Sequence, residues 1–266
     1  MKKRLLTFVL LAGISFAVHP LYAADQTTES KVPVAHKEQK DVHRTLWGTK
    51  KSPYVRKVLI TLEEKKAPYK LEGILPEKLL KATNQKIPEV FLKISPFGKI
   101  PAYQEINMTD HKEFSITESS VIMNYLNETI EETPLRPNDP KGNARVSWFM
   151  TYGNDVVAPL TYKILFEKVI KPNFLKEKTD TALVDNILKE ELPVVLDFLE
   201  KTLADNRAWI ADTKNFSLAD ITIASHLITL STTGLNLDET IGEKRPNLLQ
   251  YMRKILNRPS VKKALG

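Results

Sequence analysis

The first ordered part of the chain alternates short apolar runs with polar turns, a pattern typical of a small mixed domain of helices and strands. Residues 54–66 carry apolar side chains such as Val55 and Leu62 at helical spacing. Residues 69–74 instead alternate apolar and polar side chains with the period of a strand. The predicted order is a strand at 46–48, a helix at 54–66, a strand at 69–74, a helix at 88–94, a strand at 100–104, a turn at 107–112, and a strand from Phe114 that leads into a helix at Glu118. This order predicts an α/β domain over residues 44–131.

The second part of the chain has a different pattern. The stretch 133–137 contains two prolines and marks a linker between domains. Beyond it the strand signals stop, and helical spacing predicts helices at 144–169, 181–203, 217–230 and 246–256. The sequence therefore predicts an all-helical domain over residues 132–266.

The start of one helix in this second domain is indicated by a local motif. Ser217 can cap the backbone at Asp220, and the Asp220 carboxylate can reach back to Ser217. Phe216 and Ile221 have the spacing of a hydrophobic staple across the same turn. These residues predict a structural capping box and a helix that begins there.

The N-terminus carries a targeting pattern. Residues 1–23 combine basic residues at 2–4 with an apolar run at 5–18 and small residues at the end, which is typical of a secretory signal peptide. The apolar run is shorter than the roughly 20 residues that cross a bilayer, so a cleaved signal is favoured over a permanent anchor. The polar residues 24–43 predict a flexible spacer. We therefore expect an exported protein, periplasmic or secreted, without stable membrane insertion.

Charge and composition exclude several classes of function. The net charge is +7, or about +4 without the three basic residues of the signal. Basic and acidic residues alternate, as at positions 63–66, which indicates solvated helix faces and no nucleic-acid partner. The chain has no cysteine, so it has no disulfide, thiolate metal site or cysteine nucleophile. The histidines show no metal-ligand spacing, and no metal is predicted.

Five segments, in order, resemble motifs of the soluble glutathione transferases, specifically the serine-type branch. They are SPYVRKV at 52–58, SPFGKIP at 95–101, TESSVI at 117–122, FSLADI at 216–221 and RPSV at 258–261. The resemblance covers residues 45–266. It implies a thioredoxin-like α/β domain that binds glutathione, followed by an all-helical domain. It also implies glutathione as co-substrate with no other cofactor, a small electrophile as second substrate, and a homodimer.

Ser52 is the candidate catalytic residue. A thiol attacks as its thiolate, which is favoured where a helix N-terminus and hydrogen-bond donors converge. By the resemblance, the Ser52 hydroxyl donates to the sulfur of bound glutathione and acts as an activator without forming a covalent bond. The alternative is that Ser52, followed by Pro53, only caps a helix.

The remaining candidate residues would hold the glutathione peptide. The resemblance implies a cis bond between Ile100 and Pro101, which lets the Ile100 backbone pair with the cysteinyl part, whereas a trans proline at a strand edge is the alternative. Glu118 matches the ammonium of the γ-glutamyl end, and Ser119 at a helix start matches its carboxylate, although Ser119 also suits an ordinary capped helix. Lys99 and Lys86 are candidates for the glycine carboxylate, with solvated surface lysines as the alternative.

Two further expectations concern details of the site. Ser95 stands where the family has asparagine, and we expect it to keep the capping role of that side chain. Aromatic residues that could line an electrophile pocket between the domains, or simply fill the core, are Tyr54, Trp148, Tyr152 and Phe166.

Three functions remain open from the sequence. The leading one is conjugation of glutathione to small hydrophobic electrophiles. Glutathione-dependent peroxide reduction uses the same kind of site, and reductase chemistry that needs a cysteine is excluded. The third is an exported ligand-binding or interaction module without catalysis, for which Ser52, Glu118 and Ser119 would not be needed together.

Overall fold

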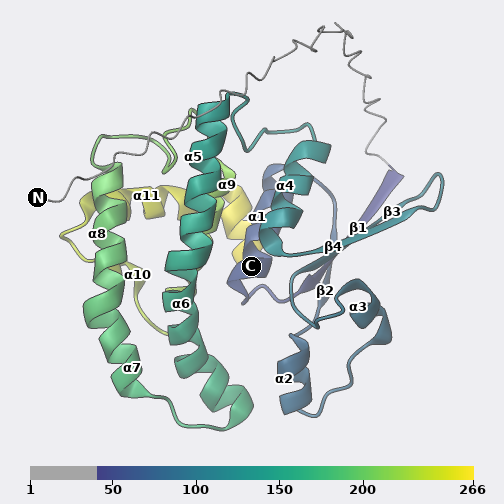
Figure 1. Ribbon diagram of the computed structural model, residues 1–266, viewed down its shortest axis with the longest axis horizontal. Coiled ribbons are helices and arrows are strands. Elements are labelled where there is room, and N and C mark those ends of the chain that lie inside the picture. The colour runs from purple at the N-terminus through teal and green to yellow at the C-terminus, as the bar shows by residue number, and fades with distance from the viewer. Residues whose placement is uncertain (1–40) are drawn as a thin grey trace, which may run out of the picture. The chain divides into compact units, whose positions relative to one another are not determined.

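The computed structural model describes residues 41–266. The predicted signal peptide and residues 24–40 of the predicted spacer lie outside the described residues. Within the described part, a four-stranded sheet with its own helices is followed by a helical domain (Figure 1). This is the fold class that the sequence predicts.

The sheet has the strand order β2-β1-β3-β4. The strands are β1 (Val42–Gly48), β2 (Lys70–Gly73), β3 (Ala102–Asn107) and β4 (Glu113–Thr117). β1 pairs parallel to β2 and antiparallel to β3, and β4 pairs antiparallel to β3. β1 begins at Val42, so Val42 and His43 belong to the sheet and not to the spacer. Their partners are Asn107 and Ile106 of β3, a pairing that no local pattern encodes.

Four helices belong to the α/β domain: α1 (Pro53–Glu64), α2 (Glu77–Ala82), α3 (Glu89–Ile94) and α4 (Ser119–Thr129). The sequence pattern missed α2, a single short helix whose only buried residue is Leu80. α1 packs against α4 and against the helices α9 and α12 of the second domain. The first helix of the α/β domain therefore forms much of the domain interface.

The helical domain starts with a long continuous helical run from Pro140 to Leu175. Its helices are α5 (Pro140–Tyr152), α6 (Ala158–Leu165), α7 (Thr181–Asn186), α8 (Leu192–Leu203), α9 (Leu218–Thr232), α10 (Leu237–Ile241), α11 (Pro246–Leu256) and α12 (Pro259–Leu265). Three π-helical segments join or extend them: η2 (Gly153–Val157), η3 (Phe166–Leu175) and η4 (Ile187–Glu191). The predicted helices at 144–169 and 181–203 correspond to these runs. The wider π turns depend on packing and could not be predicted from spacing.

α9 is the central helix of the helical domain. Every residue from Leu218 to Leu230 is buried. The predicted capping box is present, and the fully buried Asp220 carboxylate accepts hydrogen bonds from the Ser217 N–H at 2.9 Å and from its hydroxyl at 2.7 Å. Asp220 also accepts from the Ile210 N–H and the Tyr251 hydroxyl, so it ties three segments together.

The charged residues at 63–66 differ from the expectation of a solvated face. Glu64 and Lys65 are buried. Glu64 accepts two hydrogen bonds from Arg258 at 2.9 and 2.8 Å, and the Lys65 ammonium donates to the backbone carbonyl of Ile130 at 2.7 Å. Lys66 is exposed, as expected. The prediction was wrong for these two side chains because α12 and the end of α4 cover them and supply partners.

Candidate glutathione site

The predicted site residues gather at one end of the sheet. Trp47 of β1 pairs with Ala102 of β3, and Ala102 pairs with Thr117 of β4, so these residues form one row across three strands. Ser52 follows β1 in the chain, and Glu118 directly follows Thr117 at the end of β4. Ile100 and Pro101 directly precede Ala102 at the start of β3. Residues that are far apart in sequence therefore meet because the strand register brings them together.

Ser52 is the N-cap residue of α1 and is half-buried. Its hydroxyl oxygen accepts from the Val55 N–H at 3.4 Å, which is long for such a bond. A hydroxyl that accepts still has a proton to donate. The side chain thus caps α1 weakly and remains able to donate a hydrogen bond at the positive end of the helix dipole.

The segment before β3 offers an unpaired stretch of backbone. The Ile100–Pro101 bond is cis. Neither the N–H nor the C=O of Ile100 has a hydrogen-bond partner among residues 41–266. Ser95 is buried, accepts from the Lys99 N–H at 3.0 Å and donates to the Lys99 carbonyl at 2.8 Å. Ser95 therefore holds the turn, as expected of the residue at this position, and leaves the Ile100 backbone available to an extended peptide.

Glu118 has a backbone conformation that is uncommon for glutamate. It precedes α4 with φ at 68°, and its exposed side chain does not cap the helix. Ser119, the first residue of α4, is buried at 6% exposure. Strained residues of this kind concentrate at binding sites, and the free N–H groups of a helix start suit a carboxylate. The geometry thus presents a carboxylate and helix N–H donors side by side.

The two lysine candidates occupy different places. Lys99 is exposed and directly precedes Ile100. Lys86 is also exposed, lies between α2 and α3, and makes no hydrogen bond or ion pair with any residue in 41–266. Neither ammonium group has a partner among residues 41–266, and their assignment to the glycine carboxylate stays a prediction.

The helical domain contributes an aromatic residue that the sequence did not single out. The pKa of Tyr54 on α1 is raised by burial and then by the neighbouring Tyr162 and Glu118. Tyr162 of α6 therefore lies near Tyr54 of α1. Its ring is also 6.5 Å from that of Phe166. Helical spacing alone could not show which face of α6 lies toward α1.

Trp148 and Tyr152 belong to another aromatic group. Their rings stack at 5.3 Å with an interplanar angle of 7°, and Tyr152 lies 4.8 Å from Phe198 of α8. These contacts are all within the helical domain. Of the four aromatic residues predicted to line a pocket, Tyr54 has electrostatic contact with the candidate site. Trp148 and Tyr152 instead have their ring contacts within α5 and with Phe198 of α8.

Polar side chains of α1, η2 and α9 meet in the interior of the protein. Lys57 is fully buried and donates to the Asn154 side-chain oxygen at 2.7 Å. His226 of α9 is buried with its Nε2 at 3.4 Å from the same oxygen and its ring edge-on to Tyr54 at 5.4 Å. The sequence carries no signal for Lys57, which resembles any surface lysine.

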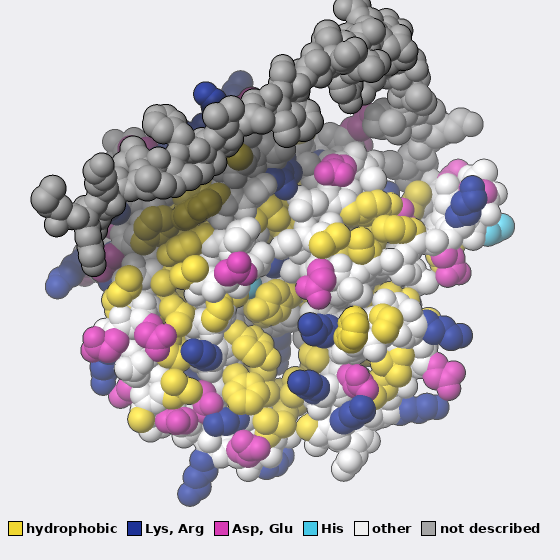
Figure 2. Space-filling view, viewed as in Figure 1, with side chains coloured by type: hydrophobic (Ala, Val, Ile, Leu, Met, Phe, Trp, Pro, Cys, Tyr) yellow, Lys and Arg dark blue, Asp and Glu magenta, His cyan; other side chains and the backbone are white. Residues whose placement is uncertain are grey.

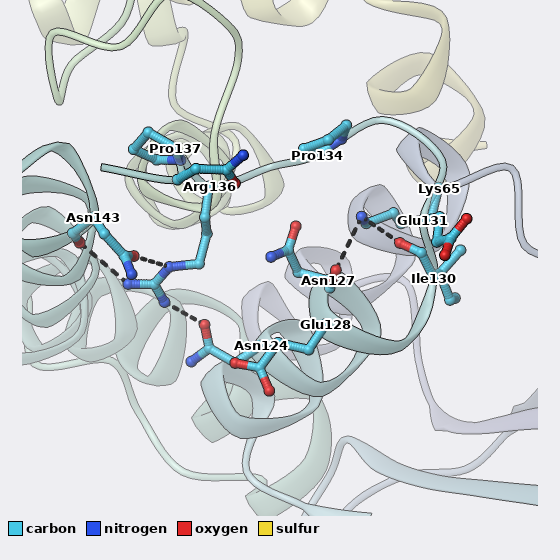
Figure 3. A pocket seen from close by; sticks show the side chains of 11 residues that line it. Lys65, Asn124, Asn127, Glu128, Ile130, Glu131, Pro134, Arg136, Pro137 and Asn143 are labelled. Carbon is cyan, nitrogen blue, oxygen red and sulfur yellow. Dashed lines mark hydrogen bonds between the residues drawn. The ribbon is translucent and has the colours of Figure 1, made fainter. Parts of the chain in front are cut away.

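A separate cavity of about 690 Å³ lies at the junction of α4, the linker and α5 (Figure 3). Its two cations have neutral hydrogen-bond partners. Arg136 donates to Asn124, Asn143 and Ser147, and Lys65 donates to the carbonyls of Asn127 and Ile130 at the C-terminal end of α4. None of the predicted site residues lines this cavity. Its position is distinct from the end of the sheet where those residues gather.

Surface charge and metal ligands add little to the site. Basic and acidic side chains are interspersed on the face shown in Figure 2. Within residues 41–266, no three His, Asp or Glu side chains are placed to hold a metal ion. No helix in the same part of the chain is long and apolar enough to cross a membrane.

A thioredoxin-like domain with these groups at its sheet end, followed by a helical domain, defines a class of glutathione-binding proteins. The family model described as "Glutathione S-transferase, N-terminal domain" matches residues 46–134, and "Glutathione S-transferase, C-terminal domain" matches residues 158–259. This chain belongs to the glutathione S-transferase family.

Individual relatives agree with that membership. A glutathione S-transferase from Hyoscyamus muticus is 31% identical over 83% of this chain and 96% of its own. Glutathione S-transferase GstB from Escherichia coli K12 is 29% identical over 83% of this chain and 97% of its own. The crystal structure of poplar glutathione transferase F1 superposes with a TM-score of 0.68 at 27% identity, covering 84% of this chain and 96% of its own.

Proposed function

We propose that this protein conjugates glutathione to small hydrophobic electrophiles, with Ser52 stabilising the thiolate. The observation that carries the proposal is the meeting of three features at one sheet end. They are a hydroxyl at the start of α1, the unpaired backbone of Ile100, and the strained Glu118 beside Ser119.

The reaction needs little from the protein beyond binding and charge stabilisation. The glutathione thiol loses its proton to solvent, and the Ser52 hydroxyl donates to the resulting sulfur anion at the positive end of α1. The sulfur forms a bond to the electrophilic carbon as the leaving group departs with the bonding electrons. Ile100, Glu118, Ser119 and Lys99 hold the peptide, with Lys86 as a further partner of its glycine carboxylate.

The test uses the mature chain from Ala24. Conjugation to a chromogenic aryl halide and binding to immobilised glutathione are measured for the wild type, Ser52→Ala and Ser115→Ala. Ser115 is an exposed serine of β4 in the same domain and serves as the matched control. We expect Ser52→Ala to lose conjugation and keep binding, and Ser115→Ala to keep both. A folded wild type that fails to bind glutathione would favour a carrier or interaction module.

We also propose that the protein acts outside the cytoplasm after removal of residues 1–23. The supporting observation is the basic, apolar and small-residue order of that segment. Expression of the full chain in a bacterium, cell fractionation and N-terminal sequencing of the product test this. An N-terminus at Ala24 in the periplasmic fraction is expected, and a full-length cytoplasmic product would contradict it.

A homodimer is the third part of the proposal. Among the apolar side chains that the α/β domain exposes, a second copy could cover Phe97 at 83%, Phe114 at 38% and Val121 at 47%. Light scattering after size exclusion should give twice the mass of the mature chain, and Phe97→Ser should lower it toward one copy. A monomeric wild type at micromolar concentration would refute this part.

A further inference from the structure

The buried ammonium of Lys57 has an unusual set of partners. Its hydrogen-bond acceptor, the Asn154 side-chain oxygen at 2.7 Å, is uncharged, and no carboxylate among residues 41–266 forms an ion pair with it. A buried cation without a paired anion is costly, so such groups are retained where they serve a ligand or another residue. Glu118 is the carboxylate whose charge acts on Lys57 most strongly.

Asn154 connects Lys57 to α4 through hydrogen bonds. Since its oxygen accepts from the ammonium, its side-chain nitrogen points the other way and donates to the Ser120 hydroxyl at 3.0 Å. Asn154 lies in the π-helical segment η2, whose wider turn sets where this side chain stands. Ser120 directly follows Ser119 in the first turn of α4, so the chain of contacts ends at the residues proposed to hold the γ-glutamyl group.

We propose that Lys57 is a positioning residue for glutathione: in its charged form it fixes the first turn of α4 through Asn154 and Ser120, and its positive charge favours the γ-glutamyl carboxylate at that turn. The inference rests on the proposed function, because it concerns binding at the same site. It makes glutathione affinity depend on the protonation of a lysine that the ligand does not need to touch.

The proton on Lys57 can be lost near neutral pH. Burial lowers its pKa from 10.5 to about 7, and the Glu118 charge opposes that shift. The groups facing Lys57 are Tyr54 on α1, His226 on α9 and Glu118 before α4. The nearby segments add the exposed charges Lys262 and Lys263 on α12, Glu128 on α4 and Asp155 in η2, and the buried Asp220 on α9. The pKa of His226 is held well below 6.5 by burial and by Lys57 and Arg56, so the histidine stays neutral.

Glutathione binding and protonation of Lys57 are linked, and this sets the direction in which affinity changes with pH. A bound carboxylate favours the charged lysine, so binding raises the pKa of Lys57 and takes up a proton above about pH 7. Affinity is therefore full below that pH and falls as the pH rises. If binding raises the pKa by about one unit, affinity falls about tenfold between about pH 6 and pH 9.

The experiment measures binding of S-hexylglutathione by calorimetry at several pH values in that range, with two buffers that differ in ionisation enthalpy. This probe has no thiol, so thiolate formation does not contribute protons. The variants are Lys57→Met, Lys57→Arg and the control Arg56→Met. Arg56 is the neighbouring buried cation, and it donates to the Ser225 carbonyl and Thr229 on α9. Thermal unfolding verifies that each variant is folded.

For Lys57→Met we expect affinity about tenfold weaker at low pH, no fall with rising pH, and loss of the proton uptake. Lys57→Arg should restore affinity and remove the pH dependence, because arginine stays charged. Arg56→Met should keep the wild-type pH profile even if it is less stable. A Lys57→Met profile parallel to the wild type would overturn this inference alone, whereas a wild type that does not bind the probe would overturn the proposed function with it.

Discussion

Two serines begin two helices in this protein, and they differ in how completely their side chains are used. Ser217 at the start of α9 is 1% exposed, and its N–H and hydroxyl both donate to Asp220. Ser52 at the start of α1 is half-buried and has a single long contact, with Val55. The third residue of α1 is this valine, which has no polar group to complete a capping box.

The comparison separates a structural serine from one available to a ligand. A hydroxyl whose donor and acceptor are both engaged inside the core contributes to stability and has nothing left for substrate. A weakly used hydroxyl at a helix start contributes little to stability but can donate to an anion. The same residue type in the same local pattern is therefore engaged to different degrees, according to what surrounds it.

The largest expected effect lies in the structural region. Asp220→Ala leaves the Ser217, Ile210 and Tyr251 donors buried without their acceptor. We expect the free energy of unfolding to fall by about 3–5 kcal/mol, measured by urea denaturation. The control is Asp155→Ala, an exposed aspartate whose side chain has no hydrogen bond or ion pair among residues 41–266, and it should change this free energy by less than about 0.5 kcal/mol. Equal effects in the two variants would remove the distinction between the helix starts.

The next prediction compares alanine substitutions of the two serines. Ser52→Ala should reduce kcat/KM for conjugation about 100-fold and the free energy of unfolding by less than about 1 kcal/mol. Ser217→Ala should do the reverse, costing about 1–2 kcal/mol of stability with kcat/KM of the folded fraction unchanged. Steady-state kinetics and urea denaturation of both variants check this. A loss of activity common to both would contradict the separation of roles.

A third prediction concerns pH and the buried lysine of α1. The pKa of Lys57 is about 7 in the folded protein, against 10.5 for the free side chain. The unfolded chain therefore binds more protons between these values, so stability rises with pH across that window and is lost as the pH falls toward 7. Relative to Lys57→Met, wild-type stability should rise by about 2 kcal/mol from about pH 7 to about pH 9. Parallel stability curves for the two proteins would show that the lysine keeps its ordinary pKa.

The smallest expected effect is on ligand affinity at the other side of the site. Glu118→Gln removes the charge that matches the γ-glutamyl ammonium, and we expect a dissociation constant for glutathione about tenfold higher. Glu113→Gln, on the exposed start of β4, is the matched control and should leave affinity unchanged. The measurement is fluorescence or calorimetric titration. Unchanged affinity in Glu118→Gln would exclude its carboxylate from binding.

The sequence predicted the elements whose signals are local. The strand and helix order of the first domain, the helix at Pro246–Leu256 and the capping box at Ser217 all follow from spacing, proline placement and side-chain reach. The short α2 and the extension of β1 to Val42 were missed. A six-residue helix has little periodicity, and the ends of a strand are set by its partners.

The sequence by itself determined the two-domain fold, the family resemblance and the residues Ser52, Ile100, Pro101, Glu118 and Ser119 as candidates, because these depend on short motifs. Only the tertiary structure decided which charges are buried. In the sequence, Lys57, Glu64 and Lys65 look like ordinary surface residues, but helix packing buries all three side chains. Burial and partner choice are set by elements distant in sequence, so the link from Lys57 through Asn154 to α4 exists only in three dimensions.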